Sequence, residues 1–218
     1  MNLIEVLNSR YATKKFDASK RITDELFEQV KALLRFSASS VNSQPWHFVI
    51  ASTAEAKKRM SQGAQGVFSA NEPKLLDASH VILFCAKTEM SDDYLQHLLD
   101  NEDRDGRFPN IEGKELGKKV RAFYADIHRV ELNDTQCWME KQVYLNLGTV
   151  LLGAGVLGID AVPIEGVDLN VLNREFDLLE KGYTASAVVA LGYRHEEDFN
   201  ASLPKSRLPE SEIFTVLK

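Results

Sequence analysis

The chain has 218 residues, of which 44% are hydrophobic and 27% are charged, and its formal net charge is −6. This composition is ordinary for a globular protein with a sizeable core, and the length predicts a single domain over residues 1–218. An acidic chain has no general attraction to nucleic acid or to an anionic membrane surface, so we expect neither as a partner.

Helices are expected where apolar residues recur at helical spacing, and strands where short apolar runs occur between turn signals. In the first half of the chain we expect a helix at 2–10, a helix capped by Thr23, a polar loop at 38–46, a strand at 47–52, a helix opened by a capping box of Ser52 and Glu55, and a strand at 79–86. In the second half we expect helices over 91–133 with a break at 105–110, a long helix at 138–158, a short extended piece at 161–165, a helix capped by Asp168, and a strand at 184–192. Few buried strands separated by helices indicate an α+β fold or a layered α/β sandwich, and spacing alone does not separate the two.

The stretch 143–159 is almost uncharged, but it is slightly shorter than the ~20 residues that a membrane-spanning helix needs. It is more simply a helix buried on all sides, and Ala154 with Gly158 would let a partner helix approach, across a dimer interface or within the chain. Residues 153–158 also match the glycine fingerprint of dinucleotide-binding proteins. A helix rather than a strand precedes them, so we interpret them as a helix-packing segment.

Metal and disulfide chemistry have little support in the sequence. Residues 101–112 resemble a calcium-binding loop, but Asn101 stands where Asp is usual and Pro109 interrupts the ligand pattern, so we expect a solvated acidic turn. Cys85 and Cys137 lack metal-ligand spacing and are expected to be thiols in a reducing compartment. The N-terminal residues lack the apolar segment of a signal peptide, and we therefore expect a cytoplasmic protein.

Five short motifs occur in order along the chain, and each is unremarkable alone. They are Arg10-Tyr-Ala-Thr-Lys14-Lys-Phe16, Ser39-Ser-Val-Asn42-Ser-Gln-Pro-Trp46, Asn71-Glu-Pro-Lys74, Pro163-Ile-Glu-Gly166 and Leu203-Pro-Lys-Ser-Arg-Leu208. Together they resemble the nitroreductase family, in particular its oxygen-insensitive enteric NAD(P)H branch and the FMN reductases of luminous bacteria. The similarity extends over essentially the whole chain.

This resemblance implies an α+β fold, built as a layered α/β/α sandwich with a central mixed sheet flanked by helices. It implies a homodimer with FMN at the subunit interface and a C-terminal tail that extends onto the partner subunit. It also implies ping-pong catalysis, in which NADH or NADPH passes a hydride to flavin N5 and the flavin passes two electrons to a nitroaromatic or a quinone.

The motifs transfer a set of flavin contacts to this chain. The set consists of Arg10, Tyr11, Ala12, Lys14, Ser39, Ser40, Asn42, Asn71, Lys74, Pro163, Glu165, Gly166, Lys205 and Arg207. Arg10, Lys205 and Arg207 match positions that bind the FMN phosphate, which suits arginine's planar fork and lysine's point charge. Lys14 and Lys74 match positions where a cation stabilises the reduced ring.

The remaining roles are also implied by the resemblance. Asn71 would contact the polar edge of the ring, and the turn from Pro163 to Gly166 would bring backbone N–H groups to N5 and O4. Glu165 is expected to be a positioning residue, and no side chain is assigned as the catalytic group because the chemistry belongs to the flavin. Ser39, Ser40 and Asn42 match the loop that the other subunit contributes.

The acceptor side is expected at Val41, Phe68, Ala70, Arg107 and Tyr124. Enteric relatives carry phenylalanine at the positions of Ala70 and Tyr124, serine at Ala12 and histidine at Tyr11. These departures leave the flavin class intact but affect which acceptor is preferred. Arg107 has an equally good alternative as a solvated loop residue.

Three functions remain compatible with these motifs. The first is an FMN-dependent NAD(P)H nitroreductase and quinone reductase. The second is a flavin reductase or dihydropteridine reductase, which shares the same motifs. The third is a flavin-binding protein without turnover, against which Lys14 and Lys74 argue because storage does not require tuning of the reduced state.

Overall fold

A four-stranded sheet in the order β1-β2-β4-β3 is the centre of the computed structural model, which describes residues 2–217. The strands are β1 (Trp46–Ala51), β2 (His80–Lys87), β3 (Asp160–Ile164) and β4 (Tyr183–Gly192). The central strand β2 alternates strictly: Val81 and Leu83 face one apolar cluster, whereas Ile82 and Phe84 face the other. This two-sided burial explains why the strand reads as a continuous apolar run.

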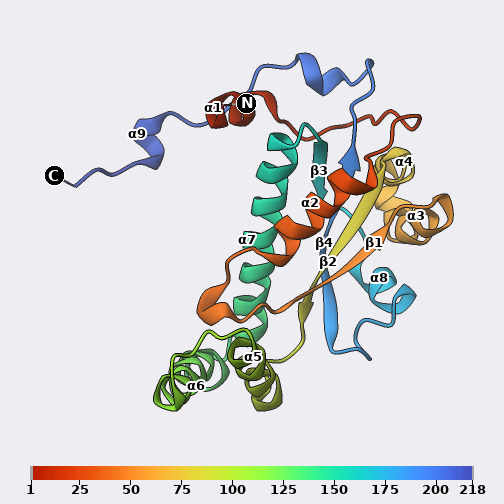
Figure 1. The fold of residues 1–218 in the computed structure, drawn as a ribbon. Coiled ribbons are helices and arrows are strands. Elements are labelled where there is room, and N and C mark those ends of the chain that lie inside the picture. Colours follow the sequence, from red (N-terminus) through yellow and green to blue (C-terminus); the bar gives the residue numbers. More distant parts are fainter. Residues whose placement is uncertain (1, 218) are drawn as a thin grey trace.

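Helices cover both faces of the sheet (Figure 1). One face packs against α2 (Asp24–Arg35) and α7 (Thr135–Val156), and the other against α3 (Ala54–Met60), α4 (Glu72–Asp77) and α8 (Leu169–Glu175). The α/β/α layering expected from the sequence is therefore confirmed.

The expectation of a mixed sheet is wrong for the described residues. All three strand pairs are antiparallel, and the parallel pairing is confined to an isolated bridge between Ala12 and Ala161. Strands that are buried on both faces have the same apolar pattern in either direction, so the sequence could not separate the two arrangements. Pro163 is tolerated because β3 is an edge strand.

Two local predictions also need correction. Thr53, rather than Ser52, caps α3, since its side chain accepts a hydrogen bond from the Ala56 N–H. Residues 61–77 form short helical segments that the sequence analysis missed, namely Ser61–Ala64, Gly66–Asn71 and α4. They are too short for a periodic pattern, and glycines and a proline interrupt them.

The end of α7 packs closely, as expected, but through different glycines. A Cβ at Gly153 would overlap Leu33 of α2, and one at Gly155 would lie 2.9 Å from Val6 Cγ1. Gly158 instead ends the helix in the left-handed region, at φ 73°. The fingerprint-like stretch thus lies at a helix C-terminus and is a packing segment, as predicted.

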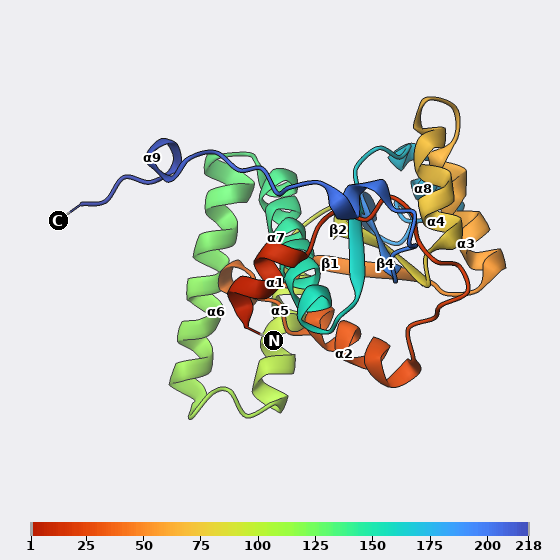
Figure 2. The same cartoon turned by 90° about the horizontal axis from the view of Figure 1, so that it is seen from above.

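The remaining helices are peripheral. They are α1 (Leu3–Ser9), α5 (Asp92–Arg104), α6 (Ile111–Asp126) and α9 (Glu210–Ile213). In Figures 1 and 2 the segment that carries α9 runs away from the body of the chain. Among the described residues, no helix is both long and apolar enough to cross a membrane.

Candidate active site

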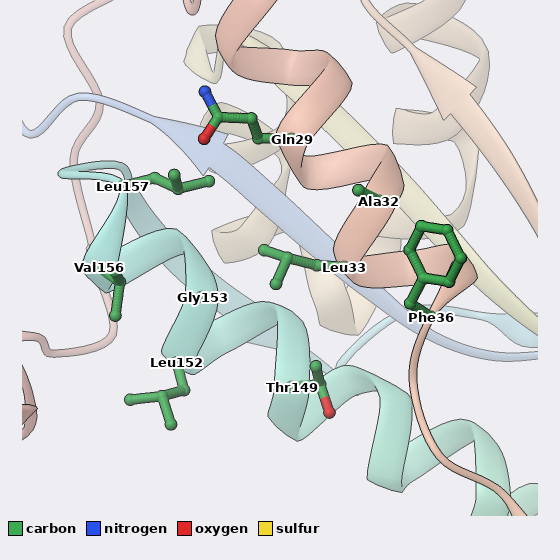
Figure 3. A pocket seen from close by; sticks show the side chains of 9 residues that line it. All are labelled: Gln29, Ala32, Leu33, Phe36, Thr149, Leu152, Gly153, Val156 and Leu157. Carbon is green, nitrogen blue, oxygen red and sulfur yellow. The ribbon is translucent and has the colours of Figure 1, made fainter.

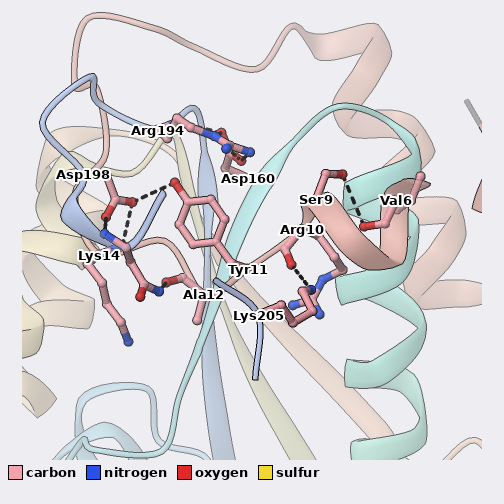
Figure 4. Close-up of polar contacts among 11 residues, drawn as sticks. Val6, Ser9, Arg10, Tyr11, Ala12, Lys14, Asp160, Arg194, Asp198 and Lys205 are labelled. Atoms are coloured by element: carbon pink, nitrogen blue, oxygen red, sulfur yellow. Dashed lines mark hydrogen bonds and ion pairs between the residues drawn. The ribbon is translucent and has the colours of Figure 1, made fainter. Parts of the chain in front are cut away.

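A cavity of about 640 Å³ lies between the end of α1, strand β3 and the C-terminal segment. It is lined by residues from 8–12, by Pro163 and Arg194, and by residues from 200–207. The structure therefore brings together Arg10, Lys205 and Arg207, although they come from opposite ends of the chain. Figure 4 shows Arg10 beside Lys205.

Lys205 reaches this cavity by binding the C-terminus of α1. Its Nζ donates hydrogen bonds to the carbonyl oxygens of Leu7, at 2.6 Å, and Arg10, at 2.5 Å. The last carbonyls of a helix have no partner within the helix and attract cations, so α1 is a natural seat for this ammonium group.

The three cations are held near one another without a compensating acid. Burial and the neighbouring Arg207 lower the pKa of Arg10, and burial followed by Arg10 and Arg207 lowers the pKa of Lys205. None of the three forms an ion pair with a carboxylate among residues 2–217. In an acidic chain, this local positive cluster is suited to a multivalent anion such as a phosphate monoester.

Asp198 and Asn200, which the sequence analysis did not single out, fix the C-terminal segment to the first motif. The Asp198 carboxylate is 3% exposed and accepts hydrogen bonds from the Tyr11 hydroxyl, at 3.2 Å, and the Lys14 N–H, at 3.0 Å. Asn200 donates to the Ala12 carbonyl at 2.9 Å. The one local signal in the sequence was an aspartate before a helical turn, which is typical of an N-cap.

Tyr11 is held firmly by the same cluster. The Arg194 guanidinium lies 4.7 Å from the centre of its ring, and Arg194 is itself paired with Asp160. Burial, together with Asp198 and Asp160, raises the pKa of Tyr11 to about 12, against the opposing effect of Arg194. The phenol therefore stays neutral and shapes the cavity wall.

A second group forms where β3 ends. Asn71 Nδ2 donates to the Gly166 carbonyl at 2.8 Å, and Lys74 Nζ donates to Asn71 Oδ1 at 2.6 Å and to the Ala70 carbonyl at 3.0 Å. A Cβ at Gly166 would lie 2.7 Å from Asn71 Nδ2, so only glycine permits this approach. Phe68 lies beside the same position.

Lys74 and Lys14 form the electrostatic part of this second group. Burial and then the charge of Lys14 lower the pKa of Lys74, so the two ammonium groups are close enough to repel. Neither pairs with a carboxylate within the described chain. An electron-rich group placed here would be stabilised by both charges.

Glu165 points toward α7 rather than toward these lysines. Its Oε1 accepts a hydrogen bond from the Tyr144 hydroxyl at 2.7 Å. Burial and then this carboxylate raise the pKa of Tyr144 to about 12. The carboxylate is thus fixed from α7, and its positioning role stays a prediction.

The other predicted residues lie elsewhere in the chain. The loop with Ser39, Ser40, Val41 and Asn42 lies beside α5 and α6, at the end of α7 far from α1 (Figure 1). Arg107 and Tyr124 belong to the same region, and they are 68% and 48% exposed, respectively. None of the described hydrogen bonds of these residues reaches the Arg10 cavity or the Asn71–Lys74 group, so one chain by itself does not assemble the full predicted set.

Comparison with known proteins identifies the family. The family model described as "Nitroreductase family" matches residues 7–193. The oxygen-insensitive NAD(P)H nitroreductase of Enterobacter cloacae is 54% identical over 215 residues, covering 99% of both chains. The major NAD(P)H-flavin oxidoreductase of Aliivibrio fischeri is 37% identical, covering 99% of this chain and 98% of that protein. The chain therefore belongs to the nitroreductase family.

Solved structures share the fold. A protein from Exiguobacterium sibiricum, solved in complex with FMN, superposes with a TM-score of 0.83 at 21% identity and covers 100% of this chain and 98% of its own. A nitroreductase family protein of Streptococcus pneumoniae superposes with a TM-score of 0.79 at 21% identity, covering 99% of this chain and 100% of its own. The expected α+β nitroreductase fold is thus confirmed.

Proposed function

We propose that the chain is an FMN-dependent NAD(P)H oxidoreductase that reduces nitroaromatics and quinones by two electrons. Two relatives that are 54% and 55% identical over nearly the whole chain are oxygen-insensitive NAD(P)H nitroreductases. The observation that carries the proposal is the division of five unpaired cations into two groups. Arg10, Lys205 and Arg207 line one cavity, whereas Lys14 and Lys74 lie together at the end of β3.

The residues present fit FMN at both of its ends. The Arg10 cavity offers a dianionic phosphate three cations that repel one another when no anion is present. Pro163 lines this cavity and is followed by Glu165 and Gly166, so β3 leads from the phosphate end toward the ring end. At the ring end, Gly166 leaves room for a flat group to approach the backbone.

Bound FMN would supply hydride acceptance and donation at N5, and the chain's own residues would bind, orient and tune it. Lys14 and Lys74 would stabilise the negative charge of the reduced ring, while Asn71, held by Lys74 and Gly166, would contact its polar edge. Glu165, held by Tyr144, is a positioning residue. No acid or base on the protein is assigned.

The acceptor side would be completed by a second copy of the chain. Ser39, Ser40, Val41 and Asn42, with Arg107 and Tyr124, lie away from the cation groups of their own chain and would reach those of a partner. The tail supports such a dimer because residues 201–217 are exposed throughout. Among the tail's large apolar side chains, Ile213, Phe214, Val216 and Leu217 are 53–91% exposed.

A groove of about 660 Å³ between α2 and α7 suits this role of partner contact (Figure 3). It is lined on the α2 side by Leu33 and Phe36, and on the α7 side by Leu152, Val156 and Leu157. We propose that the tail of the second copy covers this surface, since an exposed apolar patch of this kind is typical of a protein interface.

The free thiols Cys85 and Cys137 are compatible with a cytoplasmic location.

The second candidate is a flavin reductase or dihydropteridine reductase, favoured by the 37% identical flavin oxidoreductase of Aliivibrio fischeri. A flavin-binding protein without turnover is disfavoured, because storing a flavin does not require two neighbouring cations, Lys14 and Lys74, that stabilise its reduced state.

Anaerobic steady-state kinetics separate these functions. With NADH and NADPH as donors, the acceptors would be nitroaromatics, quinones, free FMN and a quinonoid dihydropteridine. We expect parallel-line, ping-pong kinetics with the highest kcat/KM on nitroaromatics or quinones. A preference for free flavin or for the pteridine would favour the second candidate, and no oxidation of either donor with any acceptor would contradict the enzyme assignment.

A further inference from the structure

The loop that joins α2 to β1 has a strained backbone at two residues of the predicted site, Val41 and Asn42. Val41 and Asn42 have φ values of 48° and 53°, and Gln44 has a φ of 43°. The left-handed region is unfavourable for side chains with a Cβ, and a β-branched valine there is a clear outlier. Such a backbone persists only where surrounding contacts determine it, and it is often found at functional sites.

A buried ion pair holds both of the first two strained residues. Glu102 of α5 accepts a hydrogen bond from Asn42 Nδ2 at 2.7 Å, and Arg121 Nε of α6 donates to the Val41 carbonyl at 3.1 Å. Arg121 Nη2 lies 2.5 Å from Glu102 Oε2, and both residues are 7% exposed. One carboxylate and one guanidinium thus pair with each other and hold two consecutive residues of the loop, while Arg121 Nη1 is buried without a hydrogen-bond partner among the described residues.

Other contacts fix the rest of the loop but do not reach α6. The Ser40 N–H donates to Gln142 Oε1 of α7 at 2.9 Å. The Tyr94 hydroxyl of α5 lies 2.9 Å from the Ser43 carbonyl and 2.8 Å from the Gln44 carbonyl. Among the described hydrogen bonds of this loop, that of Arg121 is the one that joins it to α6, and Val41 also packs against the apolar cluster that includes Ala125 of α6.

The same ion pair is connected to the other predicted acceptor residues. Tyr124 follows Arg121 on α6 by three residues and is therefore on a neighbouring position of the helix surface. Arg107 Nε lies 3.7 Å from Glu102 Oε1. Val41, Asn42 and Arg107 thus contact a single carboxylate–guanidinium pair, and Tyr124 lies on the helix that carries its guanidinium.

We infer that Glu102 and Arg121 are positioning residues that set acceptor specificity by holding Val41 and Asn42 in register with Tyr124. The inference rests on the proposed function, in which these residues form one wall of the acceptor site. A buried ion pair is weak as a source of stability, because a well-packed apolar pair often stabilises a fold as well. The planar guanidinium is effective as a source of register, since its donors have fixed directions: Nη2 donates to Glu102 Oε2 and Nε donates to the Val41 carbonyl.

Three variants separate register from stability. Glu102→Gln keeps an acceptor for Asn42 but removes the charge. Arg121→Lys keeps the charge but loses the donor geometry directed at Val41. The double variant Glu102→Leu/Arg121→Met replaces the pair by apolar groups of similar size. It provides a folded protein without the ion pair if a single variant is unstable.

The matched controls are Asp103→Asn and Lys114→Gln. Asp103 Oδ2 and Lys114 Nζ form an ion pair at 2.7 Å between the same two helices, but it is partly exposed and does not touch the loop. Each protein is measured in two ways. The first is the ratio of kcat/KM for a single-ring nitroaromatic to that for a two-ring quinone, and the second is amide hydrogen exchange of residues 39–44 without added acceptor.

We expect Arg121→Lys and the double variant to change the acceptor ratio about 10- to 100-fold, which is the scale that misplacement by about 1 Å produces. Exchange at 39–44 should accelerate by at least a similar factor, Glu102→Gln should be intermediate, and both controls should match the parent. Variants that lose thermal stability while keeping the parent's ratio and exchange would overturn the inference. If the parent neither binds FMN nor reduces any acceptor, the proposed function fails. Amide hydrogen exchange of residues 39–44 still decides whether the ion pair fixes the loop.

Discussion

At the scale of single residues, Lys74 is the side chain whose environment is most specific to redox tuning. It is hydrogen-bonded to Asn71 and the Ala70 carbonyl, and burial and Lys14 lower its pKa. Its ammonium group is therefore placed to stabilise a neighbouring anion by its positive charge. Lys15, the next residue after Lys14, is instead paired with Glu197 and serves as a natural control.

Lys74→Met should lower the two-electron potential of bound FMN. A hydrogen bond to a charged group contributes about 1.5–3 kcal/mol, which corresponds to a shift of about 30–60 mV for a two-electron couple. Anaerobic equilibration with a reference dye measures this shift. Lys15→Met should leave the potential unchanged, and an unchanged potential in Lys74→Met would remove this residue from the ring site.

His80 predicts how stability depends on pH. It is 6% exposed and stacked on Phe27 at 3.9 Å, and burial, followed by Arg21, lowers its pKa to about 4. The unfolded chain, with a histidine pKa of about 6.5, takes up a proton first as pH falls. The stability contributed by neutral His80 is therefore complete above about pH 6.5 and is lost as pH falls toward about 4, by about 3 kcal/mol in total.

Urea unfolding of the parent and His80→Gln between pH 7 and 4 measures this dependence. The parent should lose more stability than the variant over that interval, and the exposed variant His97→Gln should behave like the parent. Equal losses in the parent and His80→Gln would show that His80 does not titrate as its burial predicts.

Individual site residues were only partly predictable. Arg10 and Lys205 are 195 positions apart, and no spacing or charge pattern indicates that they meet; the ordered motifs did so through the family resemblance. Asp198 was missed because an isolated aspartate near an N-cap resembles many others. The contact partners of Glu102 and Arg121 were equally invisible, since a buried ion pair leaves no periodic signal.

At the scale of elements, the turn after β3 is the most sharply defined part of the site. Gly166→Ala would place a methyl group 2.7 Å from Asn71 Nδ2 and should push away the side chain that also holds Lys74. FMN affinity, measured by fluorescence quenching, should fall about tenfold or more, the scale of one or two lost hydrogen bonds.

A double-mutant cycle with Asn71→Ala tests this cause. Once the Asn71 side chain is shortened, Gly166→Ala should weaken FMN binding much less than it does in the parent. Additive losses would mean that the methyl group acts directly on the ligand or on the backbone rather than through Asn71.

Long elements were predicted well because their apolar patterns are strong. The runs at β2 and β4 and the long helix α7 were found within a few residues of their observed bounds. Strand direction was not predictable for a sheet that is covered on both faces, and the short helices over 61–77 carry too few periodic positions. Ser52 and Thr53 are adjacent residues that both suit an N-cap, so the sequence pattern did not indicate that Thr53 is the cap.

At the scale of the whole molecule, the tail is the feature that one chain leaves unexplained. Its apolar residues Ile213, Phe214, Val216 and Leu217 are more than half exposed, and the groove between α2 and α7 is open. In the structure the tail does not pack on the core of its own chain, whereas the family resemblance implies a tail that extends onto the partner subunit (Figure 2).

Deleting the chain from residue 210 onward, or introducing Phe214→Asp, should convert a dimer into a monomer and weaken FMN binding. The helical signal in circular dichroism should remain, because these residues contribute little to the chain's own core. Size-exclusion chromatography with light scattering measures the mass, with Ser211→Ala as the control. A monomeric parent, or tail variants that remain dimeric at the same concentration, would contradict the proposed assembly.

The most direct test of the flavin assignment is an anaerobic spectroscopic titration of the purified protein. We predict a yellow protein with one FMN per chain, whose flavin absorbance is bleached by NADH or NADPH and restored by one equivalent of a nitroaromatic or a quinone. A protein that cannot be loaded with FMN, or whose bound FMN neither nucleotide reduces, would contradict the assignment.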